Sequence, residues 1–391
     1  MPVALRTLLI ATLWVICGAG FFSRNEGPRP GFAVVPTHDK IGRLELKNPL
    51  TLRFDSAPVN PDQGLPMVHV ASLAETSDGI LHCVWYGGTA ECHPDVKIYL
   101  AHKEQRARWT APCAIMTREQ AEHDLGRPVQ ALGNALLIAN PDGTLRLLFV
   151  TIAMGKWSGS QLNTCLSKDG GLTWSRAERL TLSPFFNLSE LVRNRPMPLL
   201  RGGWCVPIYQ EFLGKFPELL WLEEHHYGLS YRKSRIAGGC TTFQPSVVPL
   251  DRATAVAVLR DYSDDRKVFR SLSEDGGATW SRPVPTSLPN PDAGVSGLLL
   301  SLSRILIAFN NSPLDRHELS LSVTGNGGLS WARPFAFEHE EEATFSYPFL
   351  MRTTDDSIGL AYTRKGREIR FVLFNEPWLE NQLGPYPYKE P

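Results

Sequence analysis

One short motif occurs three times in the sequence, and its form and spacing restrict the folds that the chain can adopt. The copies read SKDGGLTW at Ser167–Trp174, SEDGGATW at Ser273–Trp280 and TGNGGLSW at Thr324–Trp331. In each copy the Asp or Asn can accept backbone N–H groups of a tight turn, and the glycine permits positive φ where the chain reverses. The final tryptophan supplies a large apolar surface for packing. The motif therefore predicts a hairpin turn that packs on a neighbouring unit.

The interval between copies indicates the size of that unit. Asp275 and Asn326 are 51 residues apart, whereas Asp169 and Asp275 are 106 apart, which is two intervals of 53 with one copy lost. Arg108–Thr110 (RWT) reads as the degenerate end of another copy. A period near 50 residues matches one four-stranded sheet per repeat, as in a β-propeller blade.

The stretches between the copies favour strands. Leu145–Ile152, Ala255–Leu259 and Ile305–Phe309 are apolar runs of strand length, and 32 glycines and 30 prolines interrupt the chain. Only Arg118–Leu125 suggests a helix. We therefore predict an all-β, six-bladed propeller of four-stranded antiparallel sheets over residues 46–380, with a C-terminal tail at 381–391.

The N-terminus differs from the rest of the chain. Arg6 precedes an apolar run over Leu8–Phe22, which is shorter than the roughly 20 residues that a spanning helix prefers. We expect residues 1–25 to be a secretory signal peptide or an N-terminal membrane anchor, followed by a linker at 26–45. This predicts an exported protein that is periplasmic, secreted or anchored to a membrane facing outside the cytoplasm.

Composition argues against several classes of partner. Forty basic and forty acidic residues give a formal charge of zero, so no long-range field attracts nucleic acid. Six cysteines follow the N-terminal segment; in an exported protein they permit disulfides, although scattered buried thiols fit equally well. Cys92–Asp95 (CHPD) lacks a partner pair at zinc spacing, so we predict neither a metal nor a cofactor.

The three motif copies resemble the Asp-box, or BNR, repeats of the sialidase (neuraminidase) superfamily, and the pattern is most similar to a divergent bacterial branch. The resemblance extends from Val68 to Phe371. In that family the boxes are structural elements on the outer rim, and they also occur in propellers that are not sialidases. They therefore imply the fold, and function has to be argued from other positions.

Two positions in the first repeat match functional residues of the family. Its first strand carries the signature RIPSL, and the corresponding stretch here is HVASL, so His69 stands where the family has the first arginine of a triad. The family's acid/base aspartate lies seven residues before an apolar strand residue. Glu91 lies seven residues before Ile98 and is able to transfer a proton in the same way.

The remaining matches lie in the last three repeats. A family carboxylate precedes Pro-Ser-Val and lies sixteen residues before the second arginine; here Gln244 precedes Pro-Ser-Val, and Arg260 follows sixteen residues later. Arg316 matches the third arginine, and Tyr347 matches the nucleophilic tyrosine. The resemblance thus implies a catalytic set and a substrate-binding pair, which are Glu91, Tyr347, His69 and Gln244, and Arg260 and Arg316. Further polar residues at probable strand ends are Asn134, Asn194 and Arg195.

These residue types suit an acidic sugar. An arginine holds a carboxylate through two parallel hydrogen bonds and stays charged at any working pH. A phenol nucleophile, with an ordinary pKa near 10, needs a base, and Gln244 cannot take a proton. His69, Glu341 and Glu342 are the alternative bases. The interpretation is an exported, exo-α-sialidase-like glycoside hydrolase that acts on a terminal acidic sugar of a glycan or oligosaccharide.

Two other functions stay open at this point. A uronic-acid polysaccharide lyase would use an arginine to neutralise the substrate carboxylate, with Tyr347 and His69 as base and acid. A non-catalytic carbohydrate-binding propeller would bind through the same arginines and not turn over, because Gln244 replaces the family carboxylate.

Overall fold

A computed structural model describes residues 51–384 except 62, 105–106, 185 and 226–227, together with 11–12, 15 and 30–33. Most of the predicted leader and linker, and the tail beyond residue 384, lie outside the described residues. Within the described part of the chain, no helix combines the length and apolar character needed to span a bilayer.

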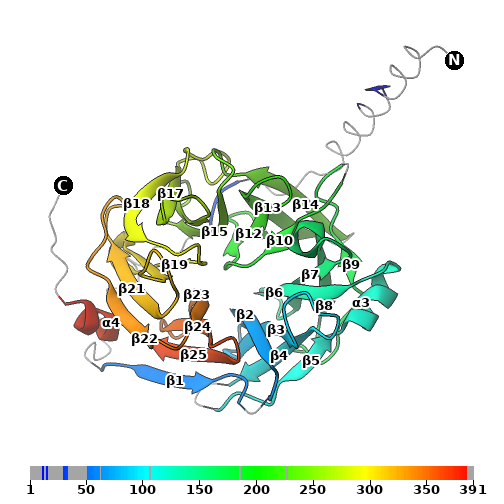
Figure 1. The fold of residues 1–391 in the computed structure, drawn as a ribbon, viewed down its shortest axis with the longest axis horizontal. Helices are drawn as coiled ribbons and strands as arrows, with labels where there is room; N and C mark the ends of the chain where they lie inside the picture. Colours follow the sequence, from blue (N-terminus) through cyan, green and yellow to red (C-terminus); the bar gives the residue numbers. More distant parts are fainter. Residues whose placement is uncertain are drawn as a thin grey trace.

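Six antiparallel sheets form a closed ring, which confirms the predicted six-bladed propeller (Figure 1). The first blade contains β2 (Met67–Glu75), β3 (Leu81–Gly88), β4 (Lys97–Lys103) and β5 (Cys113–Met116). The second contains β6 (Ala131–Ala139), β7 (Leu145–Ile152), β8 (Ser160–Ser167) and β9 (Glu178–Arg179). The third contains β10 (Leu191–Val192), β11 (Met197–Pro198), β12 (Trp204–Gln210), β13 (Phe216–His225) and β14 (Gly228–Arg235).

The last three blades complete the ring. The fourth contains β15 (Thr242–Pro249), β16 (Ala255–Asp261), β17 (Lys267–Ser273) and β18 (Val284–Pro289). The fifth contains β19 (Ser296–Leu299), β20 (Ile305–Phe309), β21 (Glu318–Thr324) and β22 (Phe335–His339). The sixth contains β23 (Phe345–Arg352), β24 (Ile358–Arg364), β25 (Glu368–Phe374) and β1 (Phe54–Pro58). Because β1 pairs with β25, the first strand in the sequence closes the ring on the last blade.

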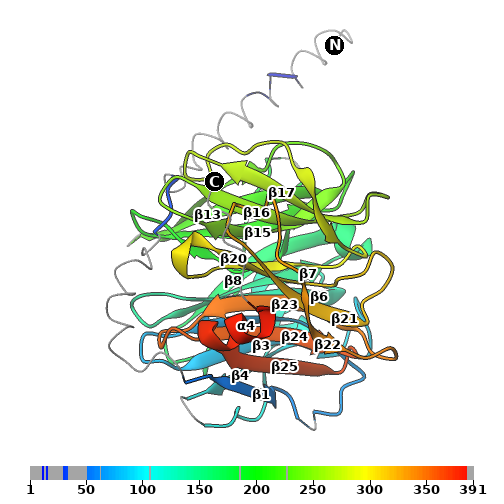
Figure 2. The same cartoon turned by 90° about the vertical axis from the view of Figure 1, so that its left-hand side faces the viewer.

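The described chain also contains short helices. They are α3 (Arg118–Leu125), α4 (Glu376–Leu383) and the 3₁₀ turns η1 (Lys156–Gly159) and η2 (Ser301–Ser303). The predicted helix α3 begins where the Thr117 side chain accepts the backbone N–H of Gln120, and it ends at Gly126, whose φ of 62° suits a left-handed cap. Helix α4 packs on the side of the ring, where Trp378 stacks on Phe54 (Figure 2).

The repeated motif forms the turn between the third and fourth strands of the second, fourth and fifth blades. In the first copy, Asp169 Oδ1 accepts the Thr173 N–H at 2.9 Å, and the Trp174 indole donates to the Gly171 carbonyl at 3.1 Å. In the third blade, β13 ends at His225 and β14 begins at Gly228, so the two residues that separate these strands in the sequence leave no room for a copy. This explains the doubled interval in the sequence.

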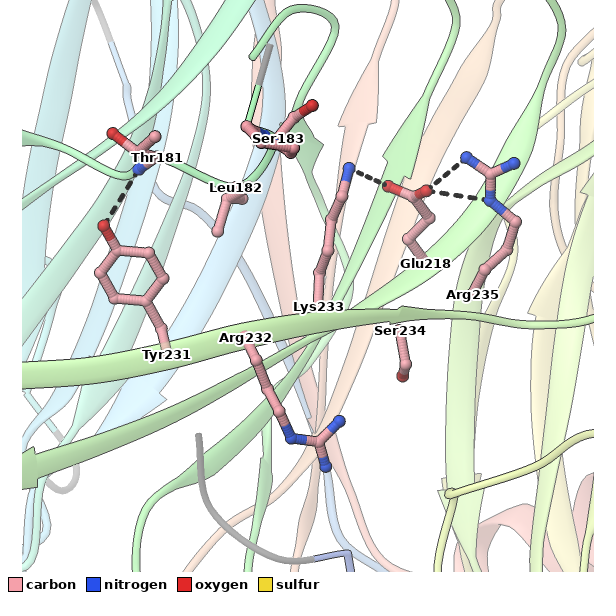
Figure 3. A pocket seen from close by; sticks show the side chains of 10 residues that line it. Thr181, Leu182, Ser183, Glu218, Tyr231, Arg232, Lys233, Ser234 and Arg235 are labelled. Carbon is pink, nitrogen blue, oxygen red and sulfur yellow. Dashed lines mark hydrogen bonds and ion pairs between the residues drawn. The ribbon is translucent and has the colours of Figure 1, made fainter. Parts of the chain in front are cut away.

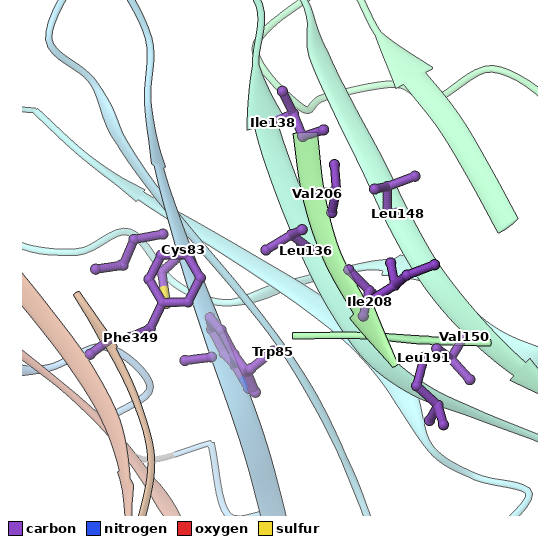
Figure 4. Close-up of a cluster of buried hydrophobic side chains, with 14 of the residues drawn as sticks. Cys83, Trp85, Leu136, Ile138, Leu148, Val150, Leu191, Val206, Ile208 and Phe349 are labelled. Carbon is purple, nitrogen blue, oxygen red and sulfur yellow. The ribbon is translucent and has the colours of Figure 1, made fainter. Parts of the chain in front are cut away.

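Apolar side chains fill the space between neighbouring blades (Figure 4). Trp85 of β3, Leu136 of β6 and Ile208 of β12 are buried in one cluster that also includes Phe349 of β23. Burying each large side chain contributes about 1.5–3 kcal/mol. All six cysteines from Cys83 to Cys240 are free; Cys83, Cys165 and Cys205 are buried thiols, whereas Cys113 and Cys240 are exposed.

Candidate functional site

A bulge recurs near the start of four inner strands, which are β2, β6, β15 and β23, and sets the backbone of the site. In three of these bulges one residue other than glycine has positive φ: Val70 at 53°, Gln244 at 49° and Tyr347 at 54°. A left-handed conformation costs a residue with a side chain about 1–2 kcal/mol. Such strain persists where surrounding structure enforces it, and it clusters at functional sites.

Serines next to the bulges provide part of that support. Ser72 Oγ accepts the backbone N–H of Leu137 at 3.2 Å, and Ser246 Oγ accepts that of Gly297 at 2.9 Å. Each bond joins the inner strand of one blade to the inner strand of the next. The serine of the Pro-Ser-Val stretch therefore holds neighbouring blades in register and fixes the bulge before it.

Arg260 and Arg316 come from different blades and meet at Asp292. Arg260, near the end of β16, donates through Nε to Asp292 Oδ1 at 2.6 Å. Arg316, just before β21, donates through Nη2 to the Asp292 backbone carbonyl at 2.8 Å and through Nη1 to Ser346 Oγ at 3.4 Å. One residue thus holds both guanidinium groups, by its side chain and its main chain. Sequence reasoning missed Asp292, which lies in a connection between blades where no motif marks it.

Tyr347 lies among aromatic and cationic groups. The centroids of the His69 and Tyr347 rings are 4.7 Å apart, with an interplanar angle of 79°. The Arg193 guanidinium carbon lies 5.2 Å from the Tyr347 ring centroid, and that of Arg316 lies 5.8 Å away. Tyr347 is half-buried, so its ring is accessible to solvent on one side. Both cations are close enough to stabilise negative charge on the phenol.

His69 also faces Glu91. His69 Nε2 lies 3.5 Å from Glu91 Oε1, which accepts a hydrogen bond from the Tyr86 hydroxyl at 3.3 Å. Burial, together with the positive charges of Arg316 and Arg193, lowers the pKa of His69 to about 3. The imidazole is therefore neutral at ordinary pH. We assign its proton to Nε2, which faces Glu91, because Nδ1 is buried without a hydrogen-bond partner and can accept a proton.

The Gln244 side chain bonds to two residues near the site. Its Oε1 accepts from Arg260 Nη1 at 3.2 Å, and its amide bonds to the Tyr209 hydroxyl, which Asn134 also contacts at 3.0 Å. An amide cannot take up a proton, so Gln244 can position Arg260 and Tyr209 but cannot act as a base.

The alternative bases from the sequence differ in position. Glu341 and Glu342 are exposed in the turn between β22 and β23, and within the described residues no contact joins either of them to Tyr347. His69 is the candidate base that lies against Tyr347.

The charges of this cluster are only partly compensated. In the described chain, Asp292 pairs with Arg260, whereas no carboxylate lies within 4.0 Å of Arg193 or Arg316. The Arg193 side chain, which sequence reasoning also missed although it named Asn194 and Arg195, is 2% exposed. Uncompensated guanidinium groups beside a half-buried phenol favour an anionic ligand.

In a cavity outside the candidate site, by contrast, the charged side chains pair with one another. It has a volume of about 320 Å³ and lies between residues 181–184 and β14 (Figure 3). There Glu218 accepts from Lys233 at 3.1 Å and from Arg235 at 2.7 Å, and buried Glu190 accepts from Lys233 at 2.6 Å. Its charges are paired with one another, and none of the site residues predicted from the sequence lines it. Among the residues that the structure describes, no three His, Cys, Asp or Glu side chains gather as a metal site.

Comparison with known proteins supports the fold. The model of a family described as a BNR repeat-like domain matches residues 79–360. A search of curated proteins found no match.

Solved structures resemble the chain at low identity. A Hadza microbial sialidase is 17% identical, with a TM-score of 0.67 over 81% of this chain and 67% of that one. A Dyadobacter fermentans protein of unknown function is 14% identical, with a TM-score of 0.65 over 83% and 99% of the two chains. The NanB sialidase of Streptococcus pneumoniae is 13% identical, with a TM-score of 0.64 over 88% and 73%. These likenesses show a shared sialidase-like propeller.

Proposed function

The chain belongs to the family of BNR repeat-like domains, and on that premise we propose that it is an exo-acting glycoside hydrolase that removes a terminal acidic sugar, as a sialidase does. One observation carries the proposal. Arg260 and Arg316, from two blades, meet at Asp292, and Arg316 lies against the ring of Tyr347. The similarity to solved sialidases supports it.

The substrate carboxylate binds at the two arginines. Arg316 gives its Nη groups to a carbonyl and a hydroxyl, which are weaker partners than a carboxylate. A sugar acid therefore gains charge-assisted hydrogen bonds when it arrives. In a sugar of the sialic-acid type the anomeric carbon bears the carboxylate, so that carbon is placed beside Tyr347.

The chemical step uses the neutral imidazole in place of the family carboxylate. The Tyr347 hydroxyl oxygen bonds to the anomeric carbon while the bond from that carbon to the leaving oxygen breaks. Glu91, in its acid form, gives its proton to the leaving oxygen, and the Tyr347 proton passes to the neutral imidazole of His69, whose ring lies against that of Tyr347. Water then attacks the same carbon and releases Tyr347; Glu91 takes a proton from the water, and His69 returns its own to the phenol oxygen.

An assay with aryl glycosides tests the proposal. Wild-type protein should release the aryl group from a sialic-acid or a uronic-acid glycoside, and Tyr347→Phe should abolish release. Glu91→Gln and His69→Gln should each lower kcat by about 10²–10⁴-fold, because each removes a proton-transfer group. Folded wild-type protein that releases nothing from either class would contradict the proposal.

A lyase is the second candidate, and the position of His69 favours it. A neutral imidazole is too weak an acid to protonate a leaving oxygen, so the roles expected from the sequence are exchanged. His69 would remove the proton next to the carboxylate, and Tyr347 would protonate the leaving oxygen. Elimination would form an unsaturated product that absorbs in the near ultraviolet, whereas hydrolysis forms none. Absorbance during digestion of a uronic-acid polysaccharide separates the two reactions.

Export belongs to the same proposal. An apolar N-terminal segment and a glycan substrate both favour action outside the cytoplasm. Fractionation of cells that express the full chain should place it in the periplasm, the medium or the membrane fraction, and recovery in the cytosol alone would contradict this part.

A further inference from the structure

Arg193 is a buried cation in the middle of the ring. Its side chain is 2% exposed, and it donates through Nη1 to Asn194 Oδ1 at 3.0 Å and to the Val295 carbonyl at 2.8 Å. Its Nη2 donates to the Pro348 carbonyl at 2.8 Å. Arg193 follows the inner strand of the third blade, so these bonds connect that blade to the fifth and sixth.

The chain makes room for this guanidinium. A Cβ atom on Gly294 would stand 2.7 Å from Arg193 Cζ, so only glycine at 294 leaves the space that the group fills. Nε is buried without a partner, and the described residues provide no carboxylate within 4.0 Å. Burial lowers the pKa of Arg193 to about 10, which leaves it charged. A buried, uncompensated charge is costly and calls for a functional explanation.

The partners of Arg193 point to Tyr347. Pro348 directly follows Tyr347 in the strained bulge, so the bond to the Pro348 carbonyl holds the backbone that presents the phenol. The guanidinium lies 5.2 Å from the ring centroid of the same tyrosine. At 2% exposure, Arg193 is out of reach of a sugar, so it can act on the reaction only through Tyr347.

We propose that Arg193 is a positioning residue for Tyr347: it fixes the bulge that presents the phenol and stabilises the negative charge that develops on the phenol oxygen as its proton leaves. The inference rests on the proposed function. It also offers a physical account of how Tyr347 acts where the family carboxylate has become Gln244, because a buried positive charge compensates in part for the missing base.

Steady-state kinetics test this role. Arg193→Met keeps much of the side-chain volume and removes the charge, and it should lower kcat by about 10²-fold while KM changes by less than about threefold. Arg193→Lys should recover part of kcat. An unchanged kcat in Arg193→Met, or a rise in KM with kcat preserved, would overturn the proposal.

Arg195→Met is the matched control. Arg195 is half-buried in the same segment, desolvation likewise lowers its pKa to about 10, and its buried Nε also lacks a partner. Both variants should lose thermal stability, but only Arg193→Met should lose kcat. Equal loss of kcat in the two variants would mean that Arg193 has only a structural role.

Chemical modification tests the inference without any substrate. Tetranitromethane nitrates tyrosines through the phenolate, so at fixed pH Tyr347 should react several-fold more slowly in Arg193→Met than in wild type, as measured by peptide mass spectrometry. Tyr262, which is 62% exposed, is the internal reference and should react equally in both proteins. Equal nitration of Tyr347 would overturn the inference even if hydrolysis is found. Slower nitration in a protein without glycosidase activity would support Arg193 while rejecting the proposed function.

Discussion

At the scale of single residues, the ability of the site to bind an acidic ligand depends on the small number of carboxylates that face its arginines. Asp292 is the anionic side chain that pairs with Arg260, and it meets Arg316 only through its backbone carbonyl. An acidic ligand would therefore displace only the hydroxyl and carbonyl partners of Arg316, which bind a guanidinium group more weakly than a carboxylate does. The two arginines should matter for binding in different degrees, because Arg260 already has a carboxylate partner.

Truncating either arginine should weaken binding of an acidic sugar. Arg316→Ala should cost about 2–5 kcal/mol, because a charge-assisted pair in a partly desolvated site is lost, and Arg260→Ala should fall at the low end of that range. Isothermal titration calorimetry with free sialic acid or a uronic acid measures both. The neutral sugar of the same ring size is the control ligand, and losses of equal size for both ligands would argue against carboxylate recognition.

At the scale of elements, the turns of the repeated motif stabilise the fold, and the inner-strand bulges position the residues of the candidate site. Trp280 is 7% exposed and donates its indole N–H to the Gly277 carbonyl at 3.1 Å. Trp280 lies in the turn between β17 and β18, and no candidate site residue lies in this turn.

Trp280→Ala should therefore cost about 3–5 kcal/mol of unfolding free energy and leave KM unchanged. The loss arises from the cavity and from the indole hydrogen bond. Urea unfolding and a KM measurement on the same preparation check both parts. A raised KM with little loss of stability would contradict the structural role of the motif.

Lys233 forms ion pairs with Glu190 and Glu218 beside the cavity of Figure 3. This network predicts that the stability of the protein depends on pH. Burial raises the pKa of Glu190 to about 7 from an ordinary value near 4.5, so the folded protein holds a proton there that the unfolded chain releases. The stability that the raised pKa of Glu190 contributes is fully present below about pH 4.5 and is lost as pH rises through about 7.

Glu190→Gln should remove that loss. The melting temperature of the variant should fall less than that of wild type between pH 5 and pH 8, because glutamine carries no charge to bury. Near pH 4 the two proteins should differ little, which serves as the control. A parallel fall in both proteins would contradict the role assigned to Glu190.

At the scale of the whole molecule, the sequence predicted the ring but only part of its centre. The three motif copies gave the period, and the period gave six blades, because a hairpin turn and a packing tryptophan leave local signals. Arg260 could be predicted because it follows a family motif at a fixed spacing, and Arg316 and Tyr347 could be predicted from their order after it.

Asp292 and Arg193 could not be found in this way. Asp292 acts from a connection between blades, and Arg193 reaches its partners across the ring, at separations of 102 and 155 residues in sequence. Such contacts depend on ring closure, which no local pattern encodes. The role of Gln244 also needed the structure, since only its neighbours show that its side chain bonds to Arg260 and Tyr209.

A crystal structure with a bound acidic sugar would show whether the two arginines recognise its carboxylate. We expect the sugar carboxylate to lie within hydrogen-bond distance of both Arg260 and Arg316, with the anomeric carbon next to the Tyr347 hydroxyl. A sugar bound elsewhere on the ring, with its carboxylate away from both guanidinium groups, would contradict this expectation.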